Sequence, residues 1–216
     1  VGDLGSSLGQ HFGDFGSRFG GLELFYVGMA LMLVGLAFKV AAAPFHFWAP
    51  DVYQGSPSPV SGYMASAAKA AGFAAMLRVF FVTFGSTSGD WSLPVAVLSA
   101  ITLIVGAVMA ITQNDLKRML AFSSVGHAGY VLVAVQSATS DGTASALFYL
   151  FTYTFMVLGS FAVIGLVGWH NGHDIERYHG LARRRPLLAV ALTIFVLGQA
   201  GVPSTSGFVA KFLVIR

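Results

Sequence analysis

The chain has 216 residues, of which 56% are hydrophobic and only 10% are charged. Soluble domains carry roughly 25% charged residues, so this composition argues against a soluble enzyme, a nucleic-acid-binding domain or a disordered segment. The net charge of +3 is too small to indicate an anionic partner, and the lack of cysteine excludes disulfides and thiolate metal sites. Because a membrane span needs about 20 apolar residues, the sequence predicts an all-α polytopic membrane protein with about six transmembrane helices.

The predicted elements alternate between polar loops and apolar spans. Residues 1–21 are polar and glycine-rich and predict a loop outside the membrane. Apolar runs predict spans at about 22–48, 60–84, 93–112, 119–136, 144–169 and 187–216, which form one transmembrane domain. The chain starts without methionine and stops inside an apolar run, so we expect it to be truncated at both ends.

Spans one and six are each interrupted by a proline. The breaks fall at Pro44 and at 201–203, and each has a lysine within a few residues. Non-helical backbone at membrane depth is tolerated where it is buried in protein or lines a cavity. Two broken helices in corresponding positions of two halves indicate a transporter built from inverted repeats, although the two halves lack clear residue-level similarity.

Loop charges predict the orientation in the membrane. The loops after spans one, three and five contain the following basic residues: Lys117, Arg118, Arg177, Arg183, Arg184 and Arg185. The loops after spans two and four contain none. Because lysine and arginine concentrate on the cytoplasmic side, we expect loops 49–59, 113–118 and 170–186 to be cytoplasmic and residues 1–21 to lie outside.

Four ionisable residues fall inside the predicted spans: Lys39, Lys69, His127 and Lys211. A charge at such depth costs a few kcal/mol or more and normally faces a polar interior. Burial disfavours the charged form of a lysine, and a lysine that changes charge near pH 7 can carry a proton. Histidine titrates near pH 7 without such tuning. The four residues are therefore candidates for proton transfer.

Each candidate has a structural alternative. Lys39 could extend its side chain to the cytoplasmic interface. Lys69 is too central for this, and its small-residue flank predicts tight helix packing. His127 could be a structural histidine bonded to Ser123 or Ser124. The depth of Lys211 is undetermined from the sequence.

Other polar features are better explained without catalysis. Five side chains in one basic loop resemble metal ligands: His170, His173, Asp174, Glu176 and His179. They lack a second-half motif, so a solvated loop without metal is favoured. Asp51 is interpreted as a helix cap or turn residue, Lys117 and Arg118 as cytoplasmic anchors, and Arg78 as an interfacial side chain.

Three segments carry a family resemblance: FKVAAAPFHFWAPDVYQGSPSPVSGYMASAAKAAGF, QNDLKRMLAFSSVGHAGYVLVAV and GQAGVPSTSGFVAKF. They resemble the N-type antiporter-like subunits of NADH-quinone oxidoreductase (complex I), in the same order, from about residue 24 to the end. The loop PDVYQGSPSPV favours the N-type subunits over their M- and L-type relatives. Lys211 also resembles the N-type, since M-type subunits usually have glutamate there.

The resemblance implies a fold of fourteen transmembrane helices with two inverted five-helix repeats. This chain would supply helices seven to eleven and most of twelve, with seven and twelve discontinuous. By motif, Lys39, Lys69 and Lys211 match the family's lysines on helices seven, eight and twelve, and His127 matches the histidine of the central hydrophilic axis. The family's glutamate partner of the helix-seven lysine would precede residue 1.

The implied function is proton translocation across the bacterial inner (plasma) membrane, coupled to quinone reduction. NADH, flavin, iron–sulfur clusters and quinone would belong to other subunits, leaving no redox chemistry, cofactor or metal in this chain. The implied partners are the neighbouring M-type and small K/J-type membrane subunits and the lipid bilayer, not nucleic acid.

The expected mechanism is electrostatic. Charging Lys39 changes the proton affinity of Lys69, and His127 with water passes the proton to Lys211. Two charges about 8 Å apart interact by about 2 kcal/mol at an effective dielectric constant of about 20, which is enough to switch a lysine poised near neutrality. The alternatives are a subunit of an Mrp-type cation/proton antiporter or membrane-bound hydrogenase, and a purely structural subunit, which the central Lys69 contradicts.

Overall fold

The computed structural model describes residues 21–168 and 173–216. Residues 1–20 of the predicted outer loop lie outside these ranges, and so does His170. The chain divides into two compact units, Val1–Leu36 and Ala37–Arg216. Helix α2 (Gly21–Lys39) provides the described part of the first unit and ends just inside the second.

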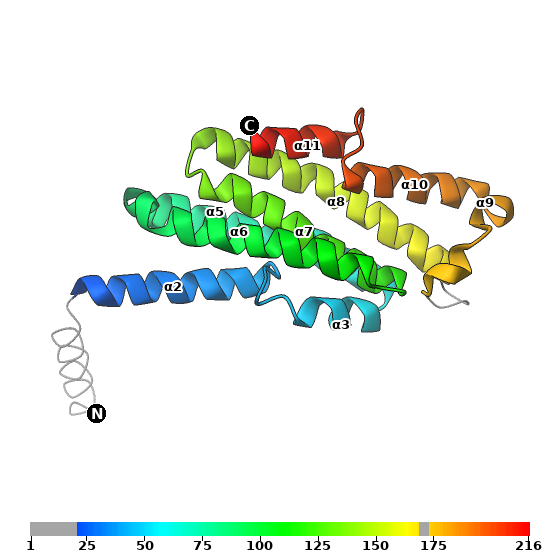
Figure 1. The fold of residues 1–216 in the computed structure, drawn as a ribbon, viewed down its shortest axis with the longest axis horizontal. Helices are drawn as coiled ribbons and strands as arrows, with labels where there is room; N and C mark the ends of the chain where they lie inside the picture. The colour runs from blue at the N-terminus through cyan, green and yellow to red at the C-terminus, as the bar shows by residue number, and fades with distance from the viewer. Residues whose placement is uncertain (1–20, 169–172) are drawn as a thin grey trace, which may run out of the picture. The chain divides into compact units, whose positions relative to one another are not determined.

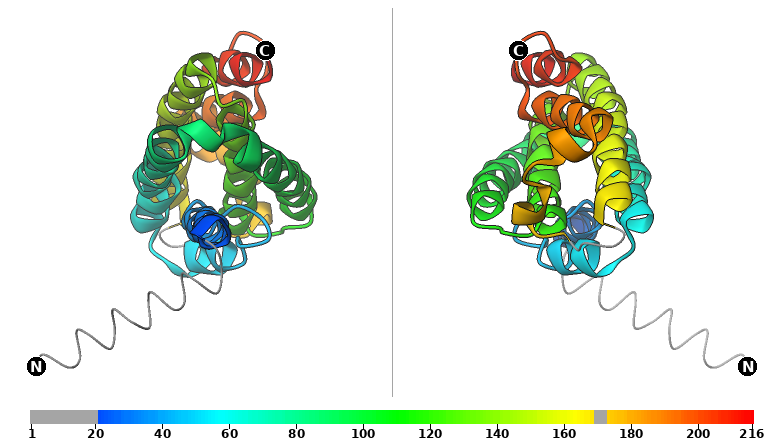
Figure 2. Two further views of the ribbon diagram at one scale, coloured as in Figure 1. Left: turned by 90° about the vertical axis from the view of Figure 1, so that its left-hand side faces the viewer. Right: turned by 90° about the vertical axis from the view of Figure 1, so that its right-hand side faces the viewer.

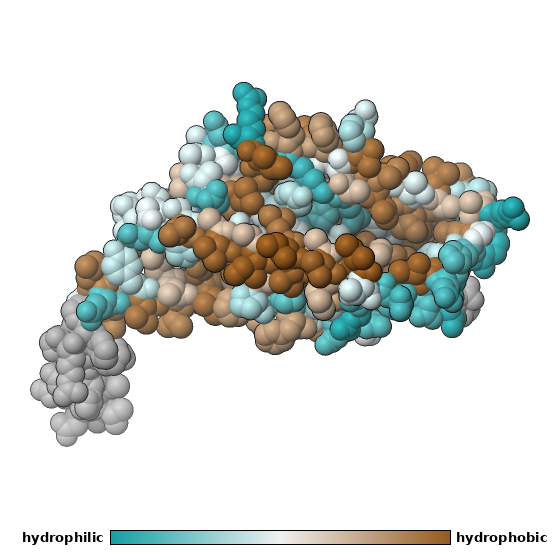
Figure 3. Space-filling model, in the orientation of Figure 1, coloured by the Kyte–Doolittle hydropathy of each residue, from teal (hydrophilic) through white to brown (hydrophobic). Residues whose placement is uncertain are grey.

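The described residues are almost entirely helical. Five helical rods are long and apolar enough to span a membrane: Gly21–Lys39, Ser58–Thr83, Gly85–Ile111, Leu116–Gln136 and Ser140–Gly168. Two shorter apolar helices follow, α10 (Pro186–Ala200) and α11 (Ser206–Ile215). Figure 3 shows apolar residues along the flanks of α6 (Ser88–Ile111) and α10, with hydrophilic residues gathered at the end that carries α9 (Leu181–Arg184). The prediction of an all-α polytopic membrane protein is confirmed.

The first interruption begins directly after Lys39, where α2 ends, and the chain becomes helical again at Trp48. Residues 40–43 are buried, so their backbone groups need partners inside the protein. The amide of Ala43 donates to the hydroxyl oxygen of Thr102 on α6 at 3.0 Å. The same hydroxyl donates to the carbonyl of Leu98 at 2.6 Å. A side chain of a neighbouring helix therefore satisfies backbone that the break has freed.

The predicted loop 49–59 is wrong for its first part, because Trp48–Gly55 forms helix α3. Pro50 lies in the first turn, where the missing amide hydrogen costs nothing. Asp51 also lies in the first turn, where a negative charge complements the helix dipole. The sequence reads as a loop because proline, aspartate and glycine are common in turns.

Lys117, which the sequence predicts to be a cytoplasmic anchor, is buried in the structure. Its side chain is 2% exposed, and its ammonium group donates to the backbone carbonyls of Gln54 and Ser56 at the C-terminal end of α3. A cation at this end offsets the helix dipole and satisfies carbonyls that have no partner within the helix. The adjacent Arg118 forms an ion pair with Asp51. Both basic residues therefore attach α3 to the start of α7 (Leu116–Gln136).

The second span, Ser58–Thr83, is one rod with two wide turns. It contains α4 (Ser58–Tyr63), the π-helix η1 (Met64–Ala68), α5 (Lys69–Arg78) and the π-helix η2 (Val79–Thr83). A π-helical turn is rare and rotates the residues that follow it relative to a regular helix. Because η1 ends at Ala68, it sets the direction in which Lys69 points.

The long helices α6 (Ser88–Ile111), α7 (Leu116–Gln136) and α8 (Ser140–Gly168) form the main body of the second unit. Helices α6 and α7 pack closely where Gly106 meets Gly126, since a Cβ on Gly106 would lie 2.4 Å from the Gly126 nitrogen. Figure 1 shows α10 and α11 following one another along α8, and the end-on views in Figure 2 agree.

The second interruption separates α10 from α11, as the sequence predicted. Gly201 has φ of +78°, a left-handed conformation that ends helices and suits glycine. Helix α11 begins after Thr205, whose hydroxyl accepts a hydrogen bond from the Phe208 amide at 3.3 Å. The turn brings α11 back against α7 and α8, which places Lys211 beside the end of α10.

Candidate functional site

Lys69 is held inside the protein at the start of α5. Its side chain is 3% exposed, and its ammonium group donates to the carbonyl oxygen of Ser124 at 2.7 Å and to the Ser124 hydroxyl at 2.6 Å. Both contacts come from α7, so a single residue on the neighbouring helix binds the buried lysine. A buried cation without a carboxylate partner is expensive, which distinguishes Lys69 from an ordinary packing residue.

Lys39 is the last residue of α2, immediately before the first interruption. Its side chain is exposed, but its stem packs on Gly72 of α5: a Cβ on Gly72 would lie 3.3 Å from the Lys39 Cγ atom. Gly72 follows Lys69 by three residues, which places both on one side of α5. At the interruption, Lys39 thus contacts the helix that carries Lys69. It takes no part in the buried hydrogen bonds between Lys69 and Ser124.

His127 lies on α7, three residues after Ser124, and is 6% exposed. Its Nδ1 atom is 2.6 Å from the hydroxyl of Tyr149 on α8, and its ring centroid is 4.5 Å from that of Tyr153. Among the described residues the hydrogen-bond partner of His127 is Tyr149 and not the predicted Ser123 or Ser124, and the Ser124 hydroxyl accepts from Lys69 instead.

Lys211 lies on α11, close to the second interruption. Its ammonium group donates to the carbonyl of Ala200, the last residue of α10, at 3.0 Å. It also lies 4.8 Å from the ring centroid of Tyr130 on α7. A helix C-terminus and an aromatic face both stabilise a cation. The broken helix therefore supplies both a lysine and part of its binding site.

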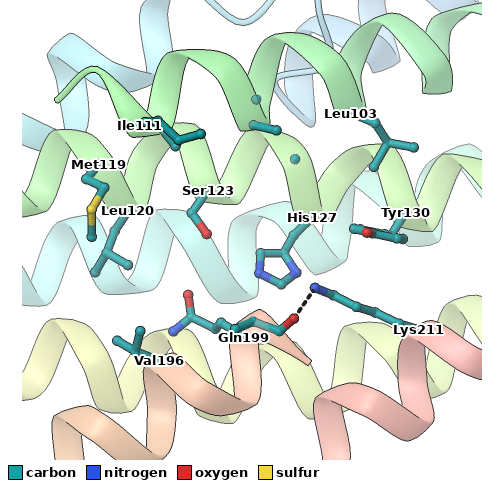
Figure 4. A pocket seen from close by; sticks show the side chains of 15 residues that line it. Leu103, Ile111, Met119, Leu120, Ser123, His127, Tyr130, Val196, Gln199 and Lys211 are labelled. Atoms are coloured by element: carbon teal, nitrogen blue, oxygen red, sulfur yellow. Dashed lines mark hydrogen bonds between the residues drawn. The ribbon is translucent and has the colours of Figure 1, made fainter. Parts of the chain in front are cut away.

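Lys211 and His127 both line a cavity of about 490 Å³. Its polar lining consists of Ser123, His127, Tyr130, Gln199 and Lys211, and its remaining walls are apolar. Figure 4 shows His127 and Lys211 approaching one another from opposite sides of this space. Along α7, Lys69 binds Ser124, three residues before His127, and Lys211 lies over Tyr130, three residues after it. The structure thus brings three of the four predicted residues together, with the histidine between two lysines.

Sequence reasoning missed the partners of these residues. The sequence motifs suggest Ser124 only as a partner of His127, and they do not include Tyr149 or Tyr153. The two tyrosines are one turn apart on α8, and both are 2% exposed. Two polar aromatic residues at this spacing inside an apolar span could have indicated an internal polar face. Nothing in the sequence pairs either of them with His127.

The candidate metal ligands of 170–186 do not gather in the described part of that segment. Among the described residues, no three histidine, aspartate or glutamate side chains lie close enough to hold a metal ion. Around His173 the segment is not a freely solvated loop. The backbone carbonyl of His173 accepts a hydrogen bond from the Leu116 amide at 2.9 Å, and the Ile175 amide donates to the Asn114 carbonyl at 2.9 Å. This short bridge attaches the segment to the start of α7.

The bridge should weaken in acid. Desolvation and then the nearby Lys117 charge lower the pKa of His173 from 6.5, against the opposing effects of Asp115 and Asp174. His173 therefore binds a proton more readily when its segment is released from α7 than when the bridge is formed. The bridge loses stability as pH falls below about 6.5. We expect faster hydrogen exchange at the Leu116 and Ile175 amides at pH 5.5 than at pH 7.5, after correction for intrinsic rates.

The matched variants for this prediction are His173→Gln and His179→Gln. His179 is exposed and lies in the same segment, whereas His173 is partly buried. The first variant should remove the pH dependence of exchange and the second should preserve it. Equal protection at both pH values in the unaltered protein would contradict the assignment to His173.

The fold and this interior define a polytopic membrane protein with two interrupted helices and with basic residues, of which Lys69 and His127 are buried, inside its apolar spans. Residues 18–216 match the family model described as NADH:quinone oxidoreductase/Mrp antiporter, TM. The chain belongs to this family.

Two curated relatives illustrate the similarity. NADH-quinone oxidoreductase subunit N of Trichlorobacter lovleyi is 51% identical over 175 residues, which cover 80% of this chain and 36% of the relative. The subunit of the same name from Rhodococcus opacus is 49% identical over 177 residues, covering 81% of this chain and 33% of the relative. The chain thus spans about a third of the length of these relatives.

Solved structures of the same family are also similar to this chain. A chain of respiratory complex I from Thermus thermophilus with bound aureothin is 41% identical, with a TM-score of 0.74 over 86% of this chain and 40% of that one. A chain of the Mrp complex from Dietzia sp. is 29% identical, with a TM-score of 0.83 over 88% and 36% of the two chains. The resemblance to N-type subunits inferred from the sequence motifs is confirmed.

Proposed function

We propose that this chain is part of a proton-translocating membrane subunit of NADH-quinone oxidoreductase. The observation that carries the proposal is the position of His127 between two lysines, of which Lys69 is buried with no carboxylate partner among the described residues and Lys211 faces a cavity. The 51% and 41% identities to subunit N and to a complex I chain support the choice of complex.

Each basic residue has a distinct role in this proposal. Lys69 holds a proton against Ser124, His127 transfers it into the cavity, and Lys211 receives it at the second interruption. Lys39 acts on this row through charge, because its stem contacts the helix that carries Lys69. Repulsion between like charges falls off slowly inside a protein, so a change at one lysine alters proton binding at the next.

The rest of the assignment follows from the proposed complex. Redox chemistry with NADH, flavin, iron–sulfur clusters and quinone takes place in other subunits, and this chain participates through coupling alone. Its partners are the neighbouring M-type and small K/J-type membrane subunits. The subunit resides in the bacterial plasma membrane with 49–59, 113–118 and 170–186 on the cytoplasmic side, a placement supported by the basic residues of 113–118 and 170–186.

A second candidate is a subunit of a cation/proton antiporter. The TM-score of 0.83 to the Mrp complex chain exceeds the 0.74 to the complex I chain. Both values describe one shared fold, whereas sequence identity separates the subfamilies, and 41% against 29% favours complex I. The two candidates differ in their driving force, which is NADH oxidation in the first and an ion gradient in the second.

The test uses the full-length subunit in its complex, reconstituted in sealed vesicles. We expect NADH oxidation by quinone to acidify the vesicle interior, and Lys211→Met to reduce this acidification by about tenfold or more, since a positioned proton-transfer group contributes about 10²-fold or more. Radioactive sodium is supplied in a parallel arm. Sodium movement driven by a proton gradient, without response to NADH, would favour the antiporter instead.

A further inference from the structure

We propose that Tyr149 is a positioning residue that fixes the tautomer of His127, so that His127 exchanges its proton with the cavity through Nε2. This inference deepens the proposed function and rests on it. The Tyr149 hydroxyl lies 2.6 Å from Nδ1 of His127, and both side chains are buried. Nδ1 is therefore occupied within the protein, and Nε2 is the ring nitrogen left for exchange.

The tyrosine ring is held in place by its surroundings. Tyr149 is 2% exposed and stacks on Tyr130, with ring centroids 6.0 Å apart and an interplanar angle of 20°. Tyr130 in turn lies beneath the ammonium group of Lys211. A ring fixed on one face by an aromatic neighbour keeps its hydroxyl at one point, which is what positioning a histidine requires.

The direction of the hydrogen bond follows from what His127 must do. If Tyr149 donated to Nδ1, neutral His127 would carry its proton on Nε2, and a second proton could enter only at the nitrogen that the tyrosine occupies. If Nδ1–H donates to the Tyr149 oxygen instead, Nε2 has a free lone pair. One proton then binds to and leaves Nε2, while the Nδ1–H bond stays intact in both charge states.

Tyr153 supplies a matched control for Tyr149. It lies one turn further along α8, is equally buried, and places its ring 4.5 Å from the His127 ring. Its hydroxyl lies near Ser124 and does not bond to His127 in the described part of the chain. Replacing either tyrosine by phenylalanine removes one oxygen and keeps the ring, but only Tyr149→Phe removes a hydrogen bond to the histidine.

The first measurement is proton pumping by the complete complex in vesicles. We expect Tyr149→Phe to lower pumping by about tenfold and Tyr153→Phe to have a clearly smaller effect. The double variant Tyr149→Phe/His127→Gln should pump no less than His127→Gln alone, because Tyr149 acts through the histidine. Losses that add in the double variant, or equal losses in the two phenylalanine variants, would overturn the proposal.

The second measurement reports the tautomer directly. Nitrogen-15 NMR of the complex with labelled histidine, using His127→Gln to assign the signal, should show neutral His127 protonated at Nδ1. Tyr149→Phe should move that proton to Nε2. An Nε2–H tautomer in the unaltered protein, or an unchanged one in Tyr149→Phe, would refute the positioning role.

Two further arms keep the outcomes distinct. If Tyr149→Phe fails to assemble, 3,5-difluorotyrosine at position 149 keeps the ring and hydroxyl but weakens the oxygen as an acceptor, and pumping should fall; unchanged pumping would overturn the proposal. If His127→Gln pumps normally, the proposed role of His127 fails. If His127→Gln is inactive while Tyr149→Phe pumps normally, only the role of Tyr149 fails.

Discussion

Lys69→Met should reduce proton pumping by the assembled complex by about 10²-fold, the size of effect expected when a proton-transfer group is removed. Methionine fills nearly the same space as the lysine stem and needs no partner, so the packing of α5 against α7 should survive. What disappears is the ammonium group that donates to the carbonyl and hydroxyl of Ser124. Proton transport into vesicles, measured with NADH oxidation, gives the result.

Arg78→Met is the matched control for this variant. Arg78 is the last residue of the same helix and is exposed, whereas Lys69 is the first residue and is buried. Both variants remove one basic side chain from α5, so a general effect of charge on insertion or assembly should affect both. Equal pumping by the two variants, at normal complex content, would show that Lys69 serves packing alone.

The sequence predicts the helices well because hydrophobicity decides which segments enter a membrane. Apolar runs indicated every long helix, and proline and glycine indicated both interruptions, including Gly201 with its positive φ. Helix α3 escaped prediction for a physical reason. Its short segment contains proline, aspartate and glycine, and its carbonyls depend on Lys117, which lies far away in the chain.

For the candidate site, the sequence predicts the ionisable residues but not their hydrogen-bond partners. Lys69, His127 and Lys211 stand out in the sequence because charged groups are costly inside a membrane. Their partners are ordinary polar residues, and which of them face one another depends on how α5, α7 and α8 pack. The π-helical turn η1 adds to this difficulty, since it shifts the register of α5 directly before Lys69. The assignment of Ser124 to Lys69 and of Tyr149 to His127 therefore required the structure.

Lys39 occupies a different environment from the other basic residues, and this difference shapes how it should be tested. It closes α2 at the first interruption, its stem contacts Gly72, and its side chain is exposed. In the proposed function, Lys39 therefore acts on Lys69 through charge across this contact. Two mechanisms are compatible with this arrangement, one in which a permanent positive charge suffices and one in which the charge must switch.

Lys39→Arg and Lys39→Ala separate the two mechanisms. Arginine remains protonated in proteins, so it keeps the charge but cannot release a proton, whereas alanine removes both. We expect both variants to lose pumping by about tenfold or more, because only a side chain that changes charge can alter proton binding at Lys69 during each cycle. Complex content is measured alongside, since the longer arginine must fit beside Gly72. Pumping near the unaltered level in Lys39→Arg, with loss in Lys39→Ala, would show that a fixed positive charge at the interruption is sufficient.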